Sequence, residues 1–287
     1  MPQALDQGSV REYSVPVVAP YRLDLTVDAL RRISSNVVDV FTSDGRYLRA
    51  FEDGTVLMAR QDRSDAITLC VHYSAPQSTL QLASLMLGLN AQLRPWYRAS
   101  KGFPWLHKLS SALRGLKPPR YPTLWEALAH AVIFQQISIF AAGAIMRRTI
   151  ESLAKPVIHD GIKLYPFPGP RAFLDCSPEV LRAAGLSLNK VTALNAIARK
   201  VCANDVNVNQ LTELRGIGPW SAAVVRLRGL GDLSVFPLKD SGVARSVRLL
   251  SGDDGIQIDE LLAGLGDQRG MLYYHLLLGR LRNQTGQ

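Results

Sequence analysis

The chain has 287 residues, of which 47% are apolar, enough to bury a large core in one or two domains. Its net charge of +9 and pI near 9.7 favour an acidic partner, and nucleic acid fits better than a membrane surface. Three scattered cysteines without a C-x-x-C pair exclude a disulfide framework and a cysteine-bound metal centre. The first residues lack the order of a signal peptide, so we expect a cytoplasmic, nucleoid-associated protein, or a nuclear one if the source is eukaryotic.

Residues 21–75 predict an antiparallel sheet with one helix. The runs LDLTV, VVDVFTSDGRYLRAFEDGTVLMARQ and ITLCVHY alternate apolar and polar residues, as strands with one buried face do. Asp44-Gly45 and Asp53-Gly54 are typical hairpin turns between such strands. A segment rich in proline and positive charge, residues 114–122, follows and resembles a linker. We therefore expect an N-terminal sheet domain over residues 1–112.

The rest of the chain, residues 113–287, predicts a mainly α-helical domain, which makes the fold class α+β. Helical periodicity begins before this domain, at residues 78–90. Within the domain it covers residues 123–151, 177–184, 189–202, 210–214, 219–230, 241–250 and 268–282. Thr123 and Glu126 match a capping box at the start of one of these helices. Residues 127–146 are nearly apolar enough to cross a bilayer, but interspersed polar side chains indicate a helix buried in a globular domain.

The segment 211–240 combines a glycine turn between two short helices with a carboxylate on the following loop. Gly216 and Gly218 allow a sharp turn that exposes backbone N–H groups, to which a phosphate can bind. Asp240 follows the extended Val235-Phe236-Pro237. Each feature also has an ordinary explanation, because Gly-Ile-Gly often caps a helix and a lone Asp often begins one. Capping and catalysis are compatible at Asp240, since a helix N-terminus favours an ionised carboxylate.

Together, Leu214–Ala222 and Val235–Asp240 resemble the hairpin L-x-G-[VI]-G-x-x-[ST]-A and the Asp loop of the HhH-GPD superfamily of DNA glycosylases. Within that superfamily the chain is similar to the bacterial 3-methyladenine DNA glycosylase II group. The resemblance covers essentially the whole chain and is weaker in the sheet portion. It implies a two-lobed helical glycosylase domain, with the hairpin at residues 210–230 and the catalytic loop at residues 234–242.

The resemblance also implies roles for individual residues. Asp240 would be the catalytic carboxylate, stabilising positive charge on the sugar or activating water. Family members that cut the strand carry a lysine where this chain has Trp220, which implies a monofunctional enzyme that leaves an abasic site. Double-stranded DNA with damaged bases would be the partner, bound by a monomer with no required cofactor. The expected DNA contacts are Gln136, Arg215, Gly216, Ile217, Gly218 and Lys239. A structural Na⁺ or K⁺ would be held by the backbone carbonyls of Thr212, Leu214 and Ile217.

The expected base pocket contains Trp220, Gln135 and one of Tyr273 and Tyr274, because adjacent helical residues point in different directions. By the same resemblance Gln136 would enter the duplex as a wedge when a base is extruded. Alternatively, the two glutamines hydrogen-bond inside a helical core and Trp220 is a core residue.

The bases expected to leave are 3-methyladenine and 7-methylguanine, which are cationic and gain from an aromatic wall. Hypoxanthine is expected to be a poor substrate, because Ser241 and Met271 replace aromatic residues of the family and make the pocket less aromatic. A glycosylase for oxidised or deaminated bases and a non-catalytic DNA-binding repair protein are the alternatives. The five histidines have no ligand-like spacing, so no transition-metal site is expected.

Overall fold

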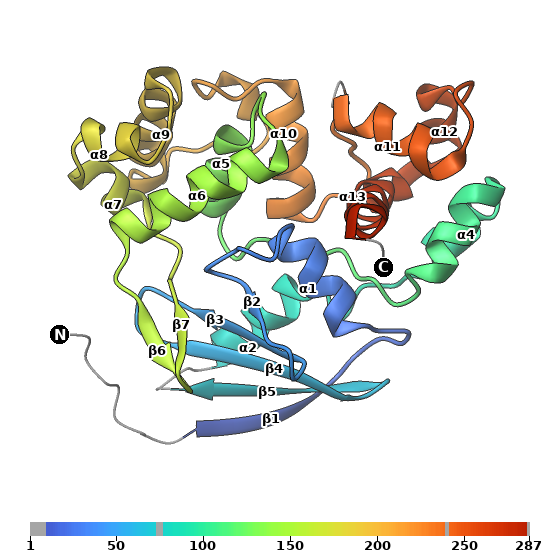
Figure 1. The fold of residues 1–287 in the computed structure, drawn as a ribbon, viewed down its shortest axis with the longest axis horizontal. Coiled ribbons are helices and arrows are strands. Elements are labelled where there is room, and N and C mark those ends of the chain that lie inside the picture. Colours follow the sequence, from blue (N-terminus) through green and yellow to red (C-terminus); the bar gives the residue numbers. More distant parts are fainter. Residues whose placement is uncertain (1–9, 73–76, 239–240, 286–287) are drawn as a thin grey trace.

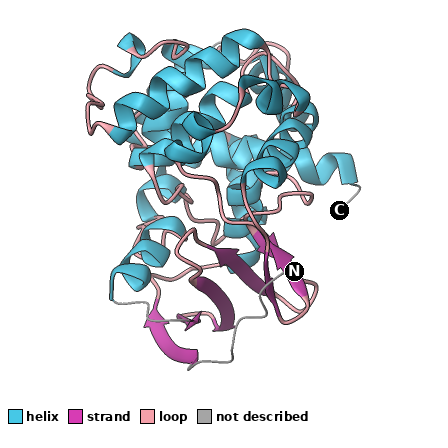
Figure 2. Cartoon of the chain, turned by 90° about the vertical axis from the view of Figure 1, so that its left-hand side faces the viewer, coloured by secondary structure: helices cyan, strands magenta, loops and turns pink. Residues whose placement is uncertain are grey.

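The computed structural model describes residues 10–72, 77–238 and 241–285. A five-stranded antiparallel sheet forms one end of the molecule and helices gather at the other (Figures 1 and 2). Its strand order is β1-β5-β4-β3-β2. The strands are β1 Val10–Pro16, β2 Val40–Phe41, β3 Arg46–Ala50, β4 Val56–Arg63 and β5 Ala66–His72. A separate small hairpin pairs β6 Val157–His159 with β7 Ile162–Leu164. The α+β fold class is confirmed.

Both predicted hairpin turns are present in the sheet. Gly45 and Gly54 have φ values of +83° and +84°, which glycine adopts without strain. The prediction of an extended LDLTV run was wrong, because it lies in helix α1, Leu23–Arg31. This helix is buried on two faces: Leu23 and Val27 pack into the core next to the sheet, and Leu25 packs into the core of the C-terminal helices. Burial on both faces produced the alternation that imitates a strand.

The remaining helices form two groups above the sheet (Figure 1). One group consists of α5 Leu124–Ile133, α6 Ile139–Leu153, α7 Pro170–Asp175, α8 Pro178–Ala183, α9 Leu188–Cys202 and α10 Pro219–Val225. The other consists of α3 Arg94–Ser100, α4 Pro104–Ala112, α11 Ser241–Ser251, α12 Ile258–Leu265 and α13 Arg269–Thr285. Helix α2, Gln77–Met86, contributes to the core beside the sheet. The groups have separate hydrophobic cores, which α1 connects.

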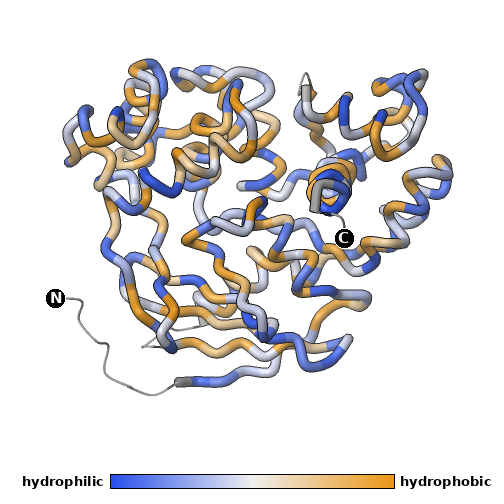
Figure 3. The backbone as a smooth tube through the Cα atoms, viewed as in Figure 1, coloured by the Kyte–Doolittle hydropathy of each residue, from blue (hydrophilic) through white to orange (hydrophobic). Residues whose placement is uncertain are grey.

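The single helix predicted over residues 123–151 is divided into α5 and α6. Gln136 has φ +58°, outside the helical range, and Ser138 begins α6 by accepting a hydrogen bond from the Ala141 N–H at 3.2 Å. No glycine or proline marks this break in the sequence. The short helices α3, α4, α7 and α12 were not predicted, and the first three carry proline in their first turn. Within the described ranges no helix is long and apolar enough to span a membrane, and Figure 3 shows hydrophobic and hydrophilic segments interleaved along the tube.

Half of the predicted capping box is present. Thr123 Oγ1 accepts a hydrogen bond from the Glu126 N–H at 3.1 Å, but the Glu126 carboxylate does not return to the cap. It binds Arg49 Nη2 at 2.5 Å, while Arg49 Nη1 binds Asp39 Oδ1 at 2.7 Å, and all three side chains are at most 2% exposed. Burial raises the pKa of Glu126 to about 7, and Arg49 opposes that rise. A buried ion network therefore joins β3 to α5.

A second buried arginine connects α1 to the helical groups. Arg228, which is fully buried, donates to the carbonyls of Ala29 and Leu30 at 2.9–3.0 Å. Its guanidinium carbon lies 4.7 Å from the Tyr121 ring centre and 5.6 Å from that of Tyr274. Because it caps the last turn of α1, Arg228 fixes the direction in which the chain leaves that helix. The proposed division of the chain near residue 112 stays a prediction.

Candidate functional site

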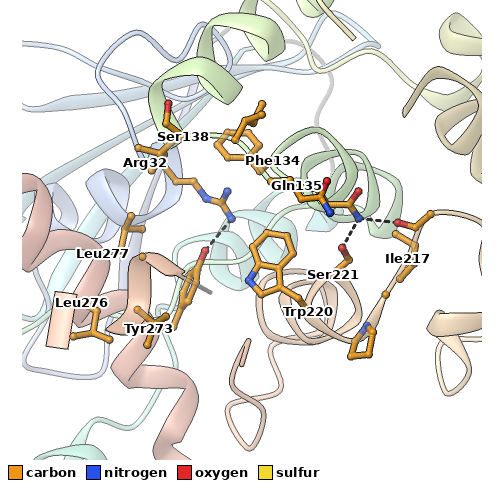
Figure 4. Close-up of a pocket in the computed structure, with 18 of the residues that line it drawn as sticks. Arg32, Phe134, Gln135, Ser138, Ile217, Trp220, Ser221, Tyr273, Leu276 and Leu277 are labelled. Carbon is orange, nitrogen blue, oxygen red and sulfur yellow. Dashed lines mark hydrogen bonds between the residues drawn. The ribbon is translucent and has the colours of Figure 1, made fainter. Parts of the chain in front are cut away.

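A cavity of about 1240 Å³ lies between the two helical groups (Figure 4). Its walls come from the turn after α5, the hairpin before α10, the first turns of α11 and one face of α13. Ten residues singled out from the sequence line it: Gln135, Gln136, Thr212, Leu214, Arg215, Gly216, Ile217, Gly218, Trp220 and Tyr273. The fold thus brings together residues separated by more than 130 positions in the chain.

The hairpin combines a buried anchor with an exposed turn. Leu214 and Ile217 are 6% and 3% exposed and pack into the core, so Ile217 presents only its backbone to a ligand. Gly216 has φ +82°, and a Cβ there would lie 2.6 Å from the Cβ of Ala193. Gly218 precedes Pro219 at the start of α10, and a Cβ there would meet nothing within 4 Å. Gly216 is therefore required for the fold of the turn, whereas Gly218 leaves open space above the turn.

Gln135 connects the turn after α5 to the hairpin. Its Nε2 donates to the Gly216 carbonyl at 2.7 Å and to Ser221 Oγ at 2.6 Å. Gln135, which was expected in the base pocket, lies on the cavity wall, and its amide nitrogen is engaged by protein. Lys190 of α9 supports the same turn by donating to the carbonyls of Ile133 and Gln135 at 2.8 and 2.9 Å. Burial lowers the pKa of Lys190. No sequence pattern distinguishes this lysine from the others on α9.

Gln136 lies at the rim of the cavity with an exposed side chain and a left-handed φ of +58°. The alternative in which it hydrogen-bonds inside a helical core is wrong, because the helix ends before it. Ile137 beside it is also exposed, at 39%, although it is apolar. An exposed apolar residue next to an exposed amide forms a protruding turn at the cavity mouth.

Trp220 and Tyr273 form aromatic walls of the cavity, and Tyr274 does not (Figure 4). Tyr274 is fully buried and its hydroxyl donates to the Pro119 carbonyl at 2.9 Å. Consecutive residues of α13 differ by about 100° in direction, so only one tyrosine reaches the cavity. Met271 is 1% exposed in the core and does not line the cavity, so its substitution for an aromatic residue does not change the walls.

Arg32 lines the cavity and was missed in the sequence. Its side chain is 4% exposed, Nη2 donates to the Tyr273 hydroxyl at 3.2 Å, and its guanidinium carbon lies 4.6 Å from the Phe134 ring centre. Figure 4 shows the guanidinium between the Tyr273 hydroxyl and the turn after α5. The backbone of Arg32 has φ +63°, which is rare for a long side chain. No local motif surrounds it, because its significance comes from contacts more than 100 residues away.

Asp240 and Lys239 lie outside the described residues. After them, Gly242, Val243, Arg245 and Ser246 line the cavity wall, and before them Phe236 packs into the core of the C-terminal helices. Within the described parts of the chain, no group of three or more His, Cys, Asp or Glu side chains could hold a metal ion.

Comparison with known proteins shows which family the segment around the cavity matches. Residues 129–265 match the family model described as HhH-GPD superfamily base excision DNA repair protein. A DNA-3-methyladenine glycosylase of Bacillus subtilis is 27% identical over 174 residues, 56% of this chain and 57% of that protein. A Mycobacterium tuberculosis protein named "Probable bifunctional transcriptional activator/DNA repair enzyme AlkA" is 30% identical over 174 residues, 58% of this chain and 35% of that protein. The chain thus matches about half, or less, of the length of these relatives.

Solved structures share the fold over nearly the full length. The 3-methyladenine DNA-glycosylase from Archaeoglobus fulgidus has a TM-score of 0.78 at 26% identity, covering 93% of this chain and 98% of that one. A Clostridium acetobutylicum 8-oxoguanine glycosylase/lyase in complex with DNA has a TM-score of 0.74 at 15% identity, covering 98% and 100%. The second likeness concerns the fold alone. Both the sheet and the helices are therefore part of the shared architecture.

Proposed function

We propose, because residues 129–265 belong to the HhH-GPD superfamily, that the chain is a monofunctional DNA glycosylase of base excision repair. It hydrolyses the N-glycosidic bond of alkylated purines such as 3-methyladenine and 7-methylguanine in double-stranded DNA and leaves an abasic site. The observation that carries this proposal is the cavity, which places the glycine hairpin, the exposed Gln136 and two aromatic walls around one space. A cavity of about 1240 Å³ is large enough for an extruded purine.

The hairpin and the exposed turn would bind DNA from two sides. Gly216 and Gly218 are exposed, so backbone N–H groups are accessible to a phosphate, and Arg215 adds an exposed positive charge. Gln136 would occupy the space that an extruded base leaves in the duplex. The net charge of +9 supports binding to a polyanion.

Asp240 would supply the chemistry. Positive charge develops on the sugar as the base departs, and a carboxylate beside it stabilises that charge or deprotonates the attacking water. The cavity-lining residues on the first turns of α11, which follow Asp240 directly, support this location for the carboxylate. Trp220 occupies the hairpin position at which related lyases carry a nucleophilic lysine, so water is the nucleophile.

The hairpin carbonyls suit a monovalent cation. Thr212, Leu214 and Ile217 belong to one tight turn on the cavity wall, and carbonyl oxygens are ligands that Na⁺ and K⁺ accept. The Leu214 carbonyl already accepts the Ile217 N–H at 3.0 Å, which leaves it a second lone pair. A cation there would add positive charge beside the exposed N–H groups.

Asp240→Asn tests the proposal. Single-turnover release of 7-methylguanine should fall by about a hundredfold or more, because one charge-stabilising group is lost, while affinity for the duplex is retained. Asp205→Asn is the matched control, since Asp205 is an exposed partner of Lys200 away from the cavity. Release by the Asp240 variant within about threefold of wild type would refute the catalytic assignment, and absence of release by the wild type would refute the activity.

A further inference from the structure

A buried guanidinium that has no carboxylate partner among the described residues faces the proposed base pocket. Within this described part of the chain, the Arg32 side chain donates only to the Tyr273 hydroxyl, and its Nε is buried without a partner. Burying a charge is costly unless other groups compensate for it. Phe134 covers one face of the guanidinium, which compensates only in part. The donors of Arg32 thus have capacity left for a ligand in the cavity.

The backbone strengthens this interpretation. Arg32 ends α1 with φ +63°, a conformation that glycine adopts easily and a long side chain rarely does. Strain of this kind persists where the surroundings hold it, and it is often associated with functional sites. Here the strain turns a charged side chain back toward the cavity. Glycine would relieve the strained φ at this helix end, so an arginine here has a cost in backbone free energy.

We propose that Arg32 is a catalytic residue that donates a hydrogen bond to the departing base. This bond would extend the substrate range to neutral purines that carry a hydrogen-bond acceptor on the edge facing Arg32. This proposal rests on the proposed glycosylase function. A cationic alkylpurine leaves readily because its ring already carries positive charge. A neutral purine such as hypoxanthine must accept the electron pair of the broken bond without that help. Arg32 provides the positive charge that such a leaving group lacks, so we expect more hypoxanthine release than Ser241 and Met271 alone predict from the sequence.

The reaction balances with water alone. The bond between C1′ of the sugar and the ring nitrogen of the base breaks, and its electron pair moves onto the base. Water adds its oxygen to C1′ and loses one proton, so the products are the free base and the abasic sugar. With a neutral purine that proton ends on the base, whereas a cationic base becomes neutral on leaving and the proton passes to solvent. Arg32 keeps its protons throughout and stabilises the electrons as they arrive. A cationic base gains little from Arg32, because its own ring already carries the positive charge that draws the electron pair.

The test compares two lesions in otherwise identical duplexes, one with 7-methylguanine and one with hypoxanthine. Single-turnover rates are measured for wild type, Arg32→Met and Arg32→Gly. The glycine variant relieves the strained φ, so a folded protein is available even if the methionine variant is unstable. Arg31→Met is the control, because Arg31 on the same helix pairs with Asp28 and does not line the cavity. Free guanidinium at low millimolar concentration is then added to the glycine variant.

We expect both Arg32 variants to lower hypoxanthine release by about a hundredfold and 7-methylguanine release by less than about threefold. Guanidinium should restore part of the hypoxanthine rate in Arg32→Gly and have no such effect on wild type. Equal losses for the two lesions, or hypoxanthine release that is absent in wild type or unchanged in the variants, would overturn the role of Arg32 and leave the proposed function intact. Failure of wild type to release 7-methylguanine would instead refute the proposed function.

Discussion

Arg49 and Arg32 are both buried arginines, but they lie in different regions and have different partners. At the interface between the sheet and α5, Arg49 binds Asp39 and Glu126, so two carboxylates compensate its charge. At the cavity, Arg32 has a tyrosine hydroxyl and an aromatic face, and no carboxylate pairs with it among the described residues. The Nε atoms of both lack a partner. Burial alone therefore does not distinguish a structural arginine from a functional one. Arg228 is also buried with carbonyl and aromatic partners in place of a carboxylate, so the distinguishing feature of Arg32 is its position on the cavity wall.

Replacing Arg49 should have the largest effect on stability. Arg49→Met would leave Asp39 and Glu126 buried without their counter-charge, and breaking such a pair costs about 3–5 kcal/mol of unfolding free energy. Without Arg49 the folded-state pKa of Glu126 should rise further above the unfolded value. The stability lost with Arg49 should accordingly be smaller at pH 5 than at pH 8, because the protonated Glu126 is favoured by folding at low pH. Urea unfolding at both pH values measures this, with Arg32→Met as the comparison.

The two hairpin glycines should show the same contrast between fold and function. Gly216→Ala places a methyl group against Ala193 at a φ of +82°, so it should cost about 1–3 kcal/mol of stability in addition to DNA affinity. Gly218→Ala adds a methyl group in open space, so it should weaken binding to damaged and undamaged duplex without lowering stability. Thermal unfolding and fluorescence anisotropy on both duplexes separate the two outcomes. Intact nonspecific affinity in both variants would contradict the phosphate-binding role of the hairpin.

Trp220 should affect catalysis with a dependence on lesion charge. Trp220→Ala removes an aromatic wall, and losing a stacking contact of about 1–2 kcal/mol lowers release of 7-methylguanine by roughly ten- to thirtyfold. Trp220→Phe retains a ring and should recover most of the rate. Single-turnover assays on 7-methylguanine and hypoxanthine measure the difference. A larger loss for hypoxanthine would show that Trp220 does not act through the positive charge of the lesion.

The last prediction concerns His130, which lies between the two regions and should affect only the pH dependence of stability. Its ring stacks on Tyr121 at 4.2 Å, and burial, followed by the charges of Arg32, Arg228 and Arg49, holds its pKa well below 6.5. A depressed histidine pKa means that the unfolded chain binds a proton first as the pH falls below 6.5. His130 should therefore contribute a decrease in stability of about 1.4 kcal/mol for each pH unit below that value, in addition to the contribution of His275, whose pKa burial lowers to about 4. His130→Phe should flatten this dependence in urea unfolding between pH 6.5 and 5; an unchanged slope would exclude His130 as its source.

The sequence predicted the parts of this molecule whose physical requirements are local. The turns at Gly45 and Gly54 need a positive φ, the cap at Thr123 needs a hydroxyl, and the hairpin needs its glycines, and each leaves a recognisable pattern. The resemblance that those patterns carry is confirmed by the family match over residues 129–265. The break between α5 and α6 left no such pattern, because tertiary contacts of Gln135 and Lys190 hold it.

Sequence reasoning failed where a residue depends on partners far along the chain. Arg32 reaches Tyr273 across 241 positions, and Lys190 reaches Ile133 across 57, so neither contact has a local signature. Helix α1 was mistaken for a strand because two cores bury opposite faces of it. For Tyr273 and Tyr274 the sequence indicated that one side chain faces inward, but only the packing of α13 shows which one.

The hydrogen bonds of Gln135 to the hairpin also fix the distance between Gln136 and the glycine turn. They connect the exposed residue Gln136 to the glycine turn through a single side chain, with Nε2 only 2.7 Å from the Gly216 carbonyl. Two points of the protein surface that we propose to touch DNA are thereby kept at a constant separation. If the proposed DNA contacts form, a hairpin that holds one phosphate would let Gln136 reach one particular base pair and not its neighbours. Moving along the duplex by one nucleotide would then require release of that phosphate, so we expect the protein to inspect DNA in discrete steps.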